Sequence, residues 1–413
     1  MSTLAVLGGD AVRTRPWPTW PDPREEDIAA VSEALRSGHW WSYDGENTRL
    51  FEREFASYHD ARHGIAVNSG TTALLVALEA LEIGPGDEVI VPAYTFQATA
   101  TSVLLANAIP VFADVQPHTM NIDPESVAAS ITRRTRAVVP VHIAGLPADM
   151  ARLAEIAEPR GIAILEDAAQ AHGAVWQGRK VGSIGHAGAF SFQASKNLPS
   201  GEGGIVLTSD DSVAARAAAL CDCGRVEGRP FYEHHLLGYN FRITEMQSAL
   251  LRSRLKHLER ETDLRWRNGQ GLTSLLKSLP GIAPLDPEPG PGDRRAYHLY
   301  AVRLRGDELG GISRQRYMEA LAAEGVPCST GYGQPLYRNP IFLEKNCRGR
   351  GCPASCGHYS GTVDYREVSC PMTEMLCEQV IWLFHNLLLG TEQDIDDIYR
   401  AFEKVTSQHR QLL

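Results

Sequence analysis

The chain lacks the features that mark membrane proteins and nucleic-acid binders. No apolar run approaches the roughly 20 residues that a membrane-spanning helix requires. The 413 residues include 40 Lys and Arg against 50 Asp and Glu, a formal net charge of −10. Nucleic acids and anionic membrane surfaces both select clustered positive charge, so neither is expected as a partner. The N-terminus has no basic stretch followed by an apolar core, so we expect no signal peptide and a cytoplasmic protein.

Two common nucleotide-binding motifs are missing as well. The chain has no G-x-x-x-x-G-K-[ST] sequence, and no G-x-G-x-x-G stands between a predicted strand and a predicted helix. The glycine-rich stretch Gly201–Gly204 fits neither pattern. P-loop and dinucleotide-binding functions are therefore not expected.

Standard zinc-ligand spacings are also absent from a chain that contains eight cysteines. Cys347, Cys352, Cys356 and His358 are spaced C-x4-C-x3-C-x-H, which matches no standard zinc pattern. We expect reduced cysteines in loops and no metal site.

Composition and length are those of a soluble enzyme with two domains. Hydrophobic residues make up 43% of the chain and charged residues 22%. Between Gly64 and about Asp210, short apolar segments alternate with helical ones. The predicted strands are Gly64–Asn68, Glu88–Pro92, Val111–Val115, Ala137–Ile143, Ile162–Leu165, Ala187–Phe192 and Ile205–Thr208. The predicted helices between them are Thr71–Leu81, Gln97–Ala106, Pro124–Ile131 and Met150–Ala157.

This alternation predicts an α/β fold. Strands that alternate with helices are joined by crossovers, which gives a mainly parallel sheet with helices on both faces. Further helices are expected at Glu25–Arg36 and, after the sheet, at Glu245–Arg260. We predict a large domain over residues 1–255 and a smaller α+β domain over residues 256–413.

Three strand ends carry residues that suit a ligand at the edge of the sheet, where open α/β sheets bind. The turn Asn68–Thr72 opens a helix whose backbone N–H groups favour an anion, although simple capping by Ser and Thr is the alternative. A second strand ends in Glu166 and Asp167, and a buried carboxylate needs a partner. Asp167 as a helix N-cap is the alternative. Phe96 follows a third strand, either as core packing or as a face for an aromatic ligand.

Lys196 is the fourth unusual residue, because a solvated lysine has no need of the serine- and glycine-rich setting SFQASKNLPSGEGG. Pyridoxal phosphate is a cofactor that needs all four features: an anion cradle, an aromatic face, a buried acid and a lysine. Its phosphate needs the helix terminus, its ring the aromatic face, its ring nitrogen an acid, and its aldehyde a lysine. On this hypothesis Lys196 is a nucleophile whose surroundings lower its pKa.

The chain resembles the DegT/DnrJ/EryC1/StrS aminotransferases, which have the type I, aspartate aminotransferase-like fold. Five motifs carry the likeness, in the order SGTTAL, PAYTF, EDAAQAHGA, SFQASKNLPSGEGG and GYNFRITEMQSALL. It extends from about Gly8 to about Lys404. The intact Lys196 favours transamination, because family members with histidine there are dehydratases. Another pyridoxal phosphate reaction, such as elimination, and a binding module without activity are the alternatives.

The resemblance implies roles for individual residues. Lys196 matches the lysine that forms the Schiff base with pyridoxal phosphate, and Asp167 matches the acid that pairs with the pyridinium nitrogen. His172 is either a hydrogen-bond partner of Asp167 or a structural histidine. The other implied cofactor contacts are Gln170 beside the phenolic oxygen, Phe96 at the stacking position, and Thr71, Thr72 and Ser191 at the phosphate.

Two further matches imply a homodimer with shared active sites. Asn240 matches an asparagine that reaches the phosphate of the neighbouring subunit, and Arg242 stands beside it, facing the active site. The alternative is that Arg242 pairs with a carboxylate of its own chain, such as Glu245.

Segments outside the cofactor set resemble the branch of the family that acts on inososes and aminohydroxybenzoate precursors. They are Gly8–Pro21, Cys370–Cys377, Trp382 and His385–Gly390. The resemblance implies an amino group moved from glutamine or glutamate to a keto-cyclitol in antibiotic biosynthesis.

The substrate side chains are expected in the C-terminal region, where Gly331–Tyr337 departs from the commonest family pattern. Tyr332, Gln334 and Tyr337 are the candidates for binding a polyhydroxy ring, unless the tyrosines only pack the small domain. The rival acceptor is a nucleotide-linked 4-keto-sugar. Its diphosphate would need a cation, for which the candidates are Arg13, Arg15 and Arg338.

Overall fold

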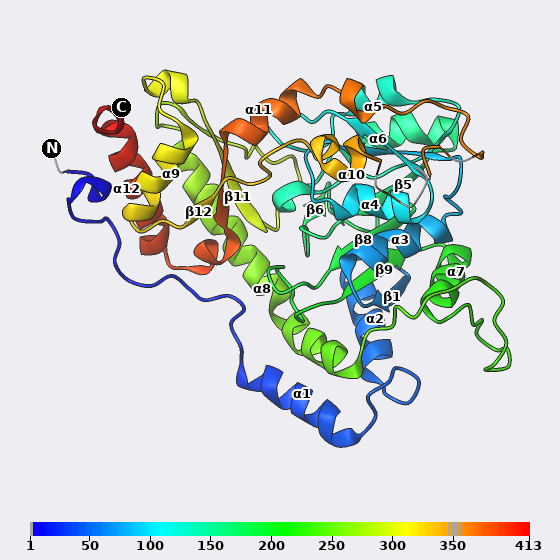
Figure 1. Cartoon of the computed structure of the whole chain (residues 1–413). Coiled ribbons are helices and arrows are strands. Elements are labelled where there is room, and N and C mark those ends of the chain that lie inside the picture. Colours follow the sequence, from blue (N-terminus) through cyan, green and yellow to red (C-terminus); the bar gives the residue numbers. More distant parts are fainter. Residues whose placement is uncertain (1–2, 346, 348–352, 356) are drawn as a thin grey trace.

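A computed structural model describes residues 3–345, 347, 353–355 and 357–413 of the chain (Figure 1). Two main sheets organise it, one of seven strands and one of four, with a short third sheet of β6 (Val175–Trp176) and β7 (Arg179–Lys180). No helix in these ranges is both long enough and apolar enough to cross a membrane. Cys352 and Cys356 lie outside the described residues.

The seven-stranded sheet has the order β1-β9-β8-β5-β4-β2-β3. Pairing is parallel from β8 to β3, whereas β9 runs antiparallel to both of its neighbours. The mainly parallel sheet and its seven predicted strands are confirmed. β4 ends earlier than predicted, because Pro140 has no N–H to donate to a sheet ladder. The strands are β1 (His63–Val67), β2 (Glu88–Pro92), β3 (Ile109–Ala113), β4 (Thr135–Val138), β5 (Ala163–Asp167), β8 (Ala187–Ser191) and β9 (Gly204–Thr208).

Helices cover both faces of this sheet, as the side-chain alternation of its strands requires. Along β9, Val206 joins the core on one face, whereas Ile205 and Leu207 join the core on the other. The first face packs against α3 (Gly70–Ala80), α4 (Ala98–Leu105) and α7 (Asp211–Cys221). The second packs against α2 (Asn47–Tyr58), α5 (Pro124–Ser130), α6 (Met150–Ala157) and the start of α8 (Glu245–Leu276). The sequence did not predict α2 and α7.

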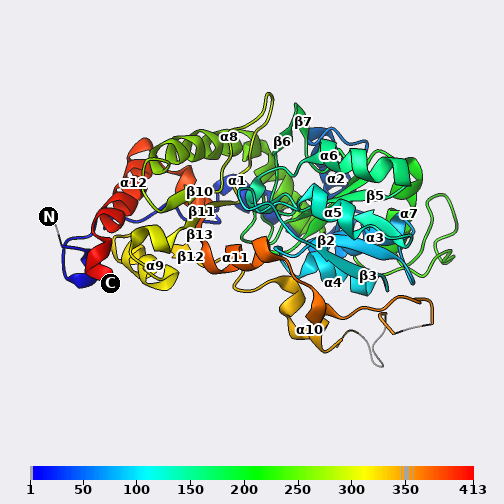
Figure 2. The ribbon, with the colours of Figure 1, turned by 90° about the horizontal axis from the view of Figure 1, so that it is seen from above.

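The smaller domain is built on an antiparallel sheet in the order β10-β11-β13-β12. Its core includes Leu272 and Leu276 of α8 together with Phe402 of α12. Figure 2 shows this domain at the end of the molecule that carries both termini. Its elements are β10 (Ile282–Pro284), β11 (Leu299–Leu304), β12 (Cys328–Ser329), β13 (Val380–Phe384), α9 (Arg314–Ala323), α11 (Pro371–Gln379) and α12 (Glu392–Ser407). The short helix α10 (Pro340–Leu343) packs instead on the large domain, with Phe342 in its core.

Helix α8 joins the two domains and is longer than the predicted segment Glu245–Arg260. Thr244 and Gln247 form a capping box at its start, and no proline interrupts it before Leu276. The predicted boundary between residues 255 and 256 therefore falls inside a continuous helix.

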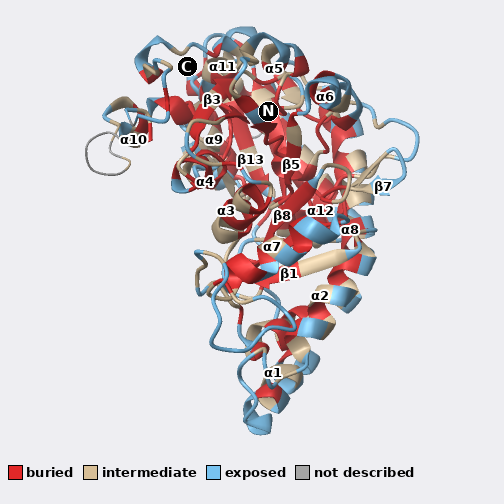
Figure 3. Cartoon of the chain, turned by 90° about the vertical axis from the view of Figure 1, so that its right-hand side faces the viewer, coloured by how far each residue is buried: buried red, intermediate tan, exposed pale blue. Residues whose placement is uncertain are grey.

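Residues 3–24, here called the N-terminal arm, also connect the domains. Arg13 in the arm forms buried ion pairs with Asp394 and Asp397 of α12, at 2.7 and 2.9 Å. The arm then leads to α1 (Glu25–Ser37), which projects from the large domain in Figure 3. The first part of the chain is thus fixed to the last helix.

Candidate active site

A pocket of ≈ 940 Å³ lies where the predicted cofactor residues converge. The strands β1, β2, β5 and β8 point the same way, so the residues that follow them meet at one edge of the sheet. Side chains of the small domain and the arm close the other side, including Tyr332, His385 and Trp20.

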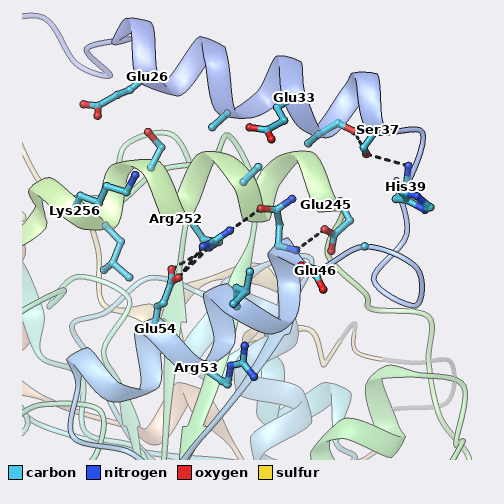
Figure 4. A pocket seen from close by; sticks show the side chains of 18 of the residues that line it. Glu26, Glu33, Ser37, His39, Glu46, Arg53, Glu54, Glu245, Arg252 and Lys256 are labelled. Carbon is cyan, nitrogen blue, oxygen red and sulfur yellow. Dashed lines mark hydrogen bonds and ion pairs between the residues drawn. The ribbon is translucent and has the colours of Figure 1, made fainter.

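A second, larger cleft of ≈ 1240 Å³ lies between α1, α2 and α8 (Figure 4). Its walls carry paired charges: Arg252 binds Glu54 at 2.9 Å, and Glu245 accepts the N–H of Asn47 at 2.7 Å. None of the predicted site residues lines it. The smaller pocket is therefore the candidate active site.

Lys196 lies in the turn between β8 and β9 and lines the pocket. The turn is fixed by backbone hydrogen bonds, with the Lys196 N–H donating to Gln193 and the Ala194 N–H donating to Gly201. Burial lowers the pKa of Lys196 to about 8, and the negative charge of Asp167 partly opposes this shift. An amine with this pKa is available as a nucleophile near neutral pH.

Asp167 is the last residue of β5 and is buried beside this lysine. Its Oδ2 accepts the hydroxyl of Thr99 at 2.8 Å, and its Oδ1 accepts the N–H of Ala169 at 3.2 Å. Burial raises its pKa, and these two hydrogen bonds oppose the rise. No helix begins directly after Asp167, because the next element of the described chain is the strand β6. The interpretation of Asp167 as a helix N-cap is therefore wrong.

Glu166, the neighbouring acid, points to the opposite face of the sheet, as adjacent strand residues must. Its carboxylate accepts the N–H groups of Gly182, Ile184 and Gly185, each at 2.7 Å, and pairs with His142 at 2.9 Å. Glu166 therefore holds a loop in place, and Asp167 alone faces the pocket.

The predicted anion cradle is at the start of α3. Ser69, Gly70 and Thr71 line the pocket, and the first N–H groups of a helix have no partner within it. A Cβ on Gly70 would lie 2.6 Å from that of Ser191, so only glycine allows the turn to approach this strand end. Thr72 does not line the pocket, because its hydroxyl completes the capping box with Ser69.

Phe96 and Gln170 both line the pocket. Phe96 is 56% exposed, so its interpretation as a core residue is wrong and its ring is free to face a ligand. Gln170 accepts the N–H of Ala144 at 2.7 Å and donates to the Tyr332 hydroxyl at 3.3 Å. Gln170 and Tyr332 thus form one hydrogen-bonded unit from the two domains.

His172 is fully buried among Phe55, Phe190 and Phe192. Neither ring nitrogen has a hydrogen-bond partner in the described part of the chain, so it does not orient Asp167 through a hydrogen bond. Burial lowers its pKa to about 3, which keeps the ring neutral. Of the two predicted roles, the structural one fits.

Asn240 and Arg242 lie outside the pocket of their own chain. Arg242 pairs with Asp222 at 2.6 Å rather than with Glu245, whose carboxylate binds the start of α2. Asn240 is exposed.

Other predicted substrate contacts lie elsewhere. Tyr337 is 1% exposed in the core of the large domain, where its hydroxyl donates to Glu374 at 2.6 Å. Gln334 is exposed and donates to Asn339 at 3.2 Å. Neither side chain lines the pocket, so of the three candidates only Tyr332 remains.

The sequence assigned no role to several residues at the site. Thr99 binds Asp167, whereas Trp20, His298 and His385 line the pocket. Trp20 and His385 lie in the segments Gly8–Pro21 and His385–Gly390, which resemble the inosose branch, but that resemblance gave neither residue a role or a contact.

The geometry matches a known family. Residues 21–363 match the DegT/DnrJ/EryC1/StrS aminotransferases. The chain belongs to this family. Within it, the chain is 40% identical to an L-glutamine:2-deoxy-scyllo-inosose aminotransferase of Streptomyces kanamyceticus, over 100% of this chain and 98% of the relative. It is 35% identical to a 3-amino-5-hydroxybenzoate synthase of Amycolatopsis mediterranei, over 92% and 94%.

Solved structures of the DegT/DnrJ/EryC1/StrS aminotransferases share the fold. A crystal structure of 3-amino-5-hydroxybenzoic acid synthase superposes with a TM-score of 0.86 at 33% identity, over 96% of this chain and 100% of that one. The DesV protein of S. venezuelae, in complex with a ketimine intermediate, gives 0.83 at 34%, over 95% and 100%. The type I fold and an aminotransferase activity follow.

Pyridoxal phosphate, the cofactor of the family, fits the residues of this pocket. The cradle at Gly70 and Ser191 suits the phosphate, Phe96 offers a ring face, and Asp167 is a buried acid beside Lys196. When bound, the cofactor supplies an electron sink for amino-group transfer. Lys196 would supply the amine that holds it, and Asp167 would supply the acid that keeps a proton on its ring nitrogen.

We expect Asp167→Asn to lower the pKa of Lys196 below about 8 in the cofactor-free chain, because Asp167 is the charge that opposes burial. kcat should fall about 10- to 100-fold, the cost of a lost hydrogen bond to a charged group. The pKa is measured from the pH dependence of Lys196 acetylation, read by mass spectrometry. Glu202→Gln, which changes another carboxylate of the pocket, should leave it unchanged. A raised pKa would contradict the assignment.

Proposed function

We propose that this aminotransferase moves an amino group from glutamine or glutamate to the keto group of a free cyclitol, in aminoglycoside-type antibiotic biosynthesis. The observation that carries the proposal is the charge of the pocket. Among its described lining residues, Lys196 is the sole Lys or Arg. Burial lowers the pKa values of the lining His298 and His385, so both rings are neutral. A free cyclitol carries no charge and needs only hydrogen-bonding groups.

The three arginines considered for a diphosphate are engaged elsewhere. Arg13 and Arg15 both pair with Asp394 and Asp397, at distances of 2.7 to 3.0 Å. Arg338 pairs with Glu374 at 2.8 Å. None of them lines the pocket. Phosphate groups are usually bound by Arg or Lys, and the lining residues of a single chain offer no cation for a diphosphate besides Lys196.

The pocket offers neutral groups for a hydroxylated ring. Gln170 and Tyr332 are hydrogen-bonded to each other at one wall, and Ser329 and Asn386 line it from the small domain. Trp382 packs edge-on against Tyr332, with ring centroids 4.8 Å apart, and gives this wall an apolar body. In the reaction, Lys196 would move the proton at the carbon that gains or loses the amino group.

We also propose that two chains share each active site, with Asn240 and Arg242 reaching the pocket of the partner. Both lie outside the pocket of their own chain, and Asn240 is exposed. Nearby, the exposed rings of Trp41, Tyr43 and Phe231 pack together, with centroids of 4.3 and 5.5 Å from Tyr43. Arg242 lies over Trp41 at 5.6 Å. Exposed apolar clusters of this kind often mark protein interfaces.

A panel of acceptors tests the substrate. We expect kcat/KM for scyllo-inosose or a deoxy analogue to exceed that for any dTDP- or UDP-linked 4-keto-sugar by about 100-fold or more, because the diphosphate would enter without its cations. Steady-state assays with glutamine and glutamate should show ping-pong kinetics. Turnover of nucleotide-linked ketones alone would overturn the acceptor and leave the aminotransferase activity intact. Elimination without amino transfer would overturn both.

A further inference from the structure

Two side chains from outside the large domain donate hydrogen bonds to the backbone carbonyls on either side of the Lys196 Cα. The indole Nε1–H of Trp20 donates to the Lys196 carbonyl at 3.1 Å, from 176 positions earlier in the chain. The Nε2 of His385 donates to the Ser195 carbonyl at 3.1 Å, from 190 positions later. Trp20 belongs to the N-terminal arm, and His385 follows β13 of the small domain.

Trp20 and His385 also contact each other. Their rings meet edge to face, with centroids 4.8 Å apart and an interplanar angle of 82°. Because the Nε2 of His385 carries the proton given to Ser195, its Nδ1 is unprotonated, and the ring is neutral. Both rings line the pocket beside Lys196.

Two arginines of α8 fix the Trp20 ring from behind. The guanidinium carbons of Arg254 and Arg265 lie 5.1 and 5.2 Å from its centroid, within the range of cation–π attraction. Arg254 is itself fixed by an ion pair with Asp27 at 2.9 Å. Arg265 is fully buried, and its nearest ion-pair partner is Glu261 at 3.6 Å.

The ends of the arm segment are tied down as well. Asn386 donates to the Pro18 carbonyl at 2.6 Å, and Arg254 donates to the Asp22 carbonyl at 3.1 Å. Trp20 therefore sits between two anchored points, one on the small domain and one on α8. Its indole has little freedom to leave the Lys196 carbonyl.

We infer that Trp20 and His385 are positioning residues that clamp the Lys196 backbone and hold its amine inside the pocket. The inference rests on the proposed role of Lys196 and adds a link from the arm and the small domain to the nucleophile. Both peptide units that flank the Cα are fixed, so the side chain leaves the backbone in one direction. Titratable groups around the amine include Asp167 and the neutral His172, His298 and His385, and Glu202 and Tyr332 line the same pocket.

Removing one clamp bond should raise the pKa of Lys196 from about 8 toward its usual value. A freed turn lets the ammonium move toward water or Asp167, and both favour the charged form. Trp20→Phe keeps an aromatic ring against the arginines and removes the N–H donor together with the smaller ring of the indole, a loss of ring area that the control Trp17→Phe shares. Acetylation of Lys196 at pH 7.5 in the cofactor-free full chain should then fall about fivefold, since each pKa unit changes the deprotonated fraction tenfold. In the loaded enzyme kcat should fall, with KM for the ketone unchanged.

Matched variants separate the clamp from general packing. His385→Leu should reproduce the effect of Trp20→Phe, whereas His385→Gln, which retains an N–H donor, should restore wild-type labelling. Trp17→Phe is the control, because Trp17 lies in the same arm and donates an equivalent 2.7 Å bond to Gly325, away from the pocket. Lys180 in the same digest provides the reference rate.

The proposal fails if Trp20→Phe and His385→Leu melt normally and label Lys196 as the wild type does. It also fails if Trp17→Phe gives the same shift, or if either clamp variant is unfolded at 25 °C, which would make the contact structural. Failure of the proposed role of Lys196 gives a different result: the cofactor would then be found on another lysine in every variant.

Discussion

Lys196→Ala should fold normally and lose at least about 10⁴-fold in kcat, because on the proposed function one side chain would serve as both the nucleophile and the proton carrier. After reduction with borohydride, the wild-type chain should carry the cofactor covalently on Lys196, and the variant should carry none. Intact mass and peptide mass spectrometry measure both states. The melting temperature should change little, since the side chain points into the pocket and fills no core.

Lys180→Ala is the matched control for this loss. Lys180 is also partly buried with a lowered pKa, but it pairs with Glu259 at 3.0 Å, away from the pocket. This variant should keep both the covalent cofactor and the activity. A cofactor found on any lysine other than Lys196 would show that the nucleophile has been assigned wrongly.

Mixing two inactive variants should restore activity if sites are shared between subunits. One variant is Lys196→Ala, and the other carries Asn240→Ala and Arg242→Ala. In a heterodimer, one site combines the Lys196→Ala change with the Asn240→Ala and Arg242→Ala changes. The other site contains none of these changes, so one of the two sites is complete. Random exchange makes half of the dimers mixed, and the mixture should recover about a quarter of the wild-type activity.

Differently tagged chains allow the heterodimer to be purified and its composition verified, and each variant exchanged with itself is the control. A purified heterodimer should have about half of the wild-type activity per dimer. If it stays inactive, Asn240 and Arg242 serve their own chain, and the ion pair of Arg242 with Asp222 is their main role.

Local sequence patterns were sufficient for the sheet and for the pairing of Lys196 with Asp167. Alternating strands and helices imply crossovers, and crossovers bring the strand ends together at one edge. The pattern also showed that two adjacent acids end β5, and strand alternation places them on opposite faces. Only the structure shows that Glu166 binds backbone N–H groups of the loop after β7, whereas Asp167 lines the pocket.

The rest depends on contacts that no local pattern encodes. Tyr337 looked like a substrate contact because it lies near Tyr332 in a loop, yet its ring packs on Phe112 in the large domain. Trp20 and His385 touch across almost the whole chain, and neither stretch carries a motif for that contact. The prediction ended this helix at Arg260, although no stop signal occurs there and α8 continues to Leu276.

The attachment of the arm to α12 has a consequence for synthesis on the ribosome. Arg13 is made early, but its partners Asp394 and Asp397 follow 381 and 384 positions later. Strands β1 to β9 can pair while the C-terminal helices are still being added, because domains begin to fold from the N-terminal side. The arm, in contrast, has to wait for the last helix. The turn that carries Lys196 can thus form well before His385 is made, and the hydrogen bonds of Trp20 and His385 to that turn can form only near the end of synthesis.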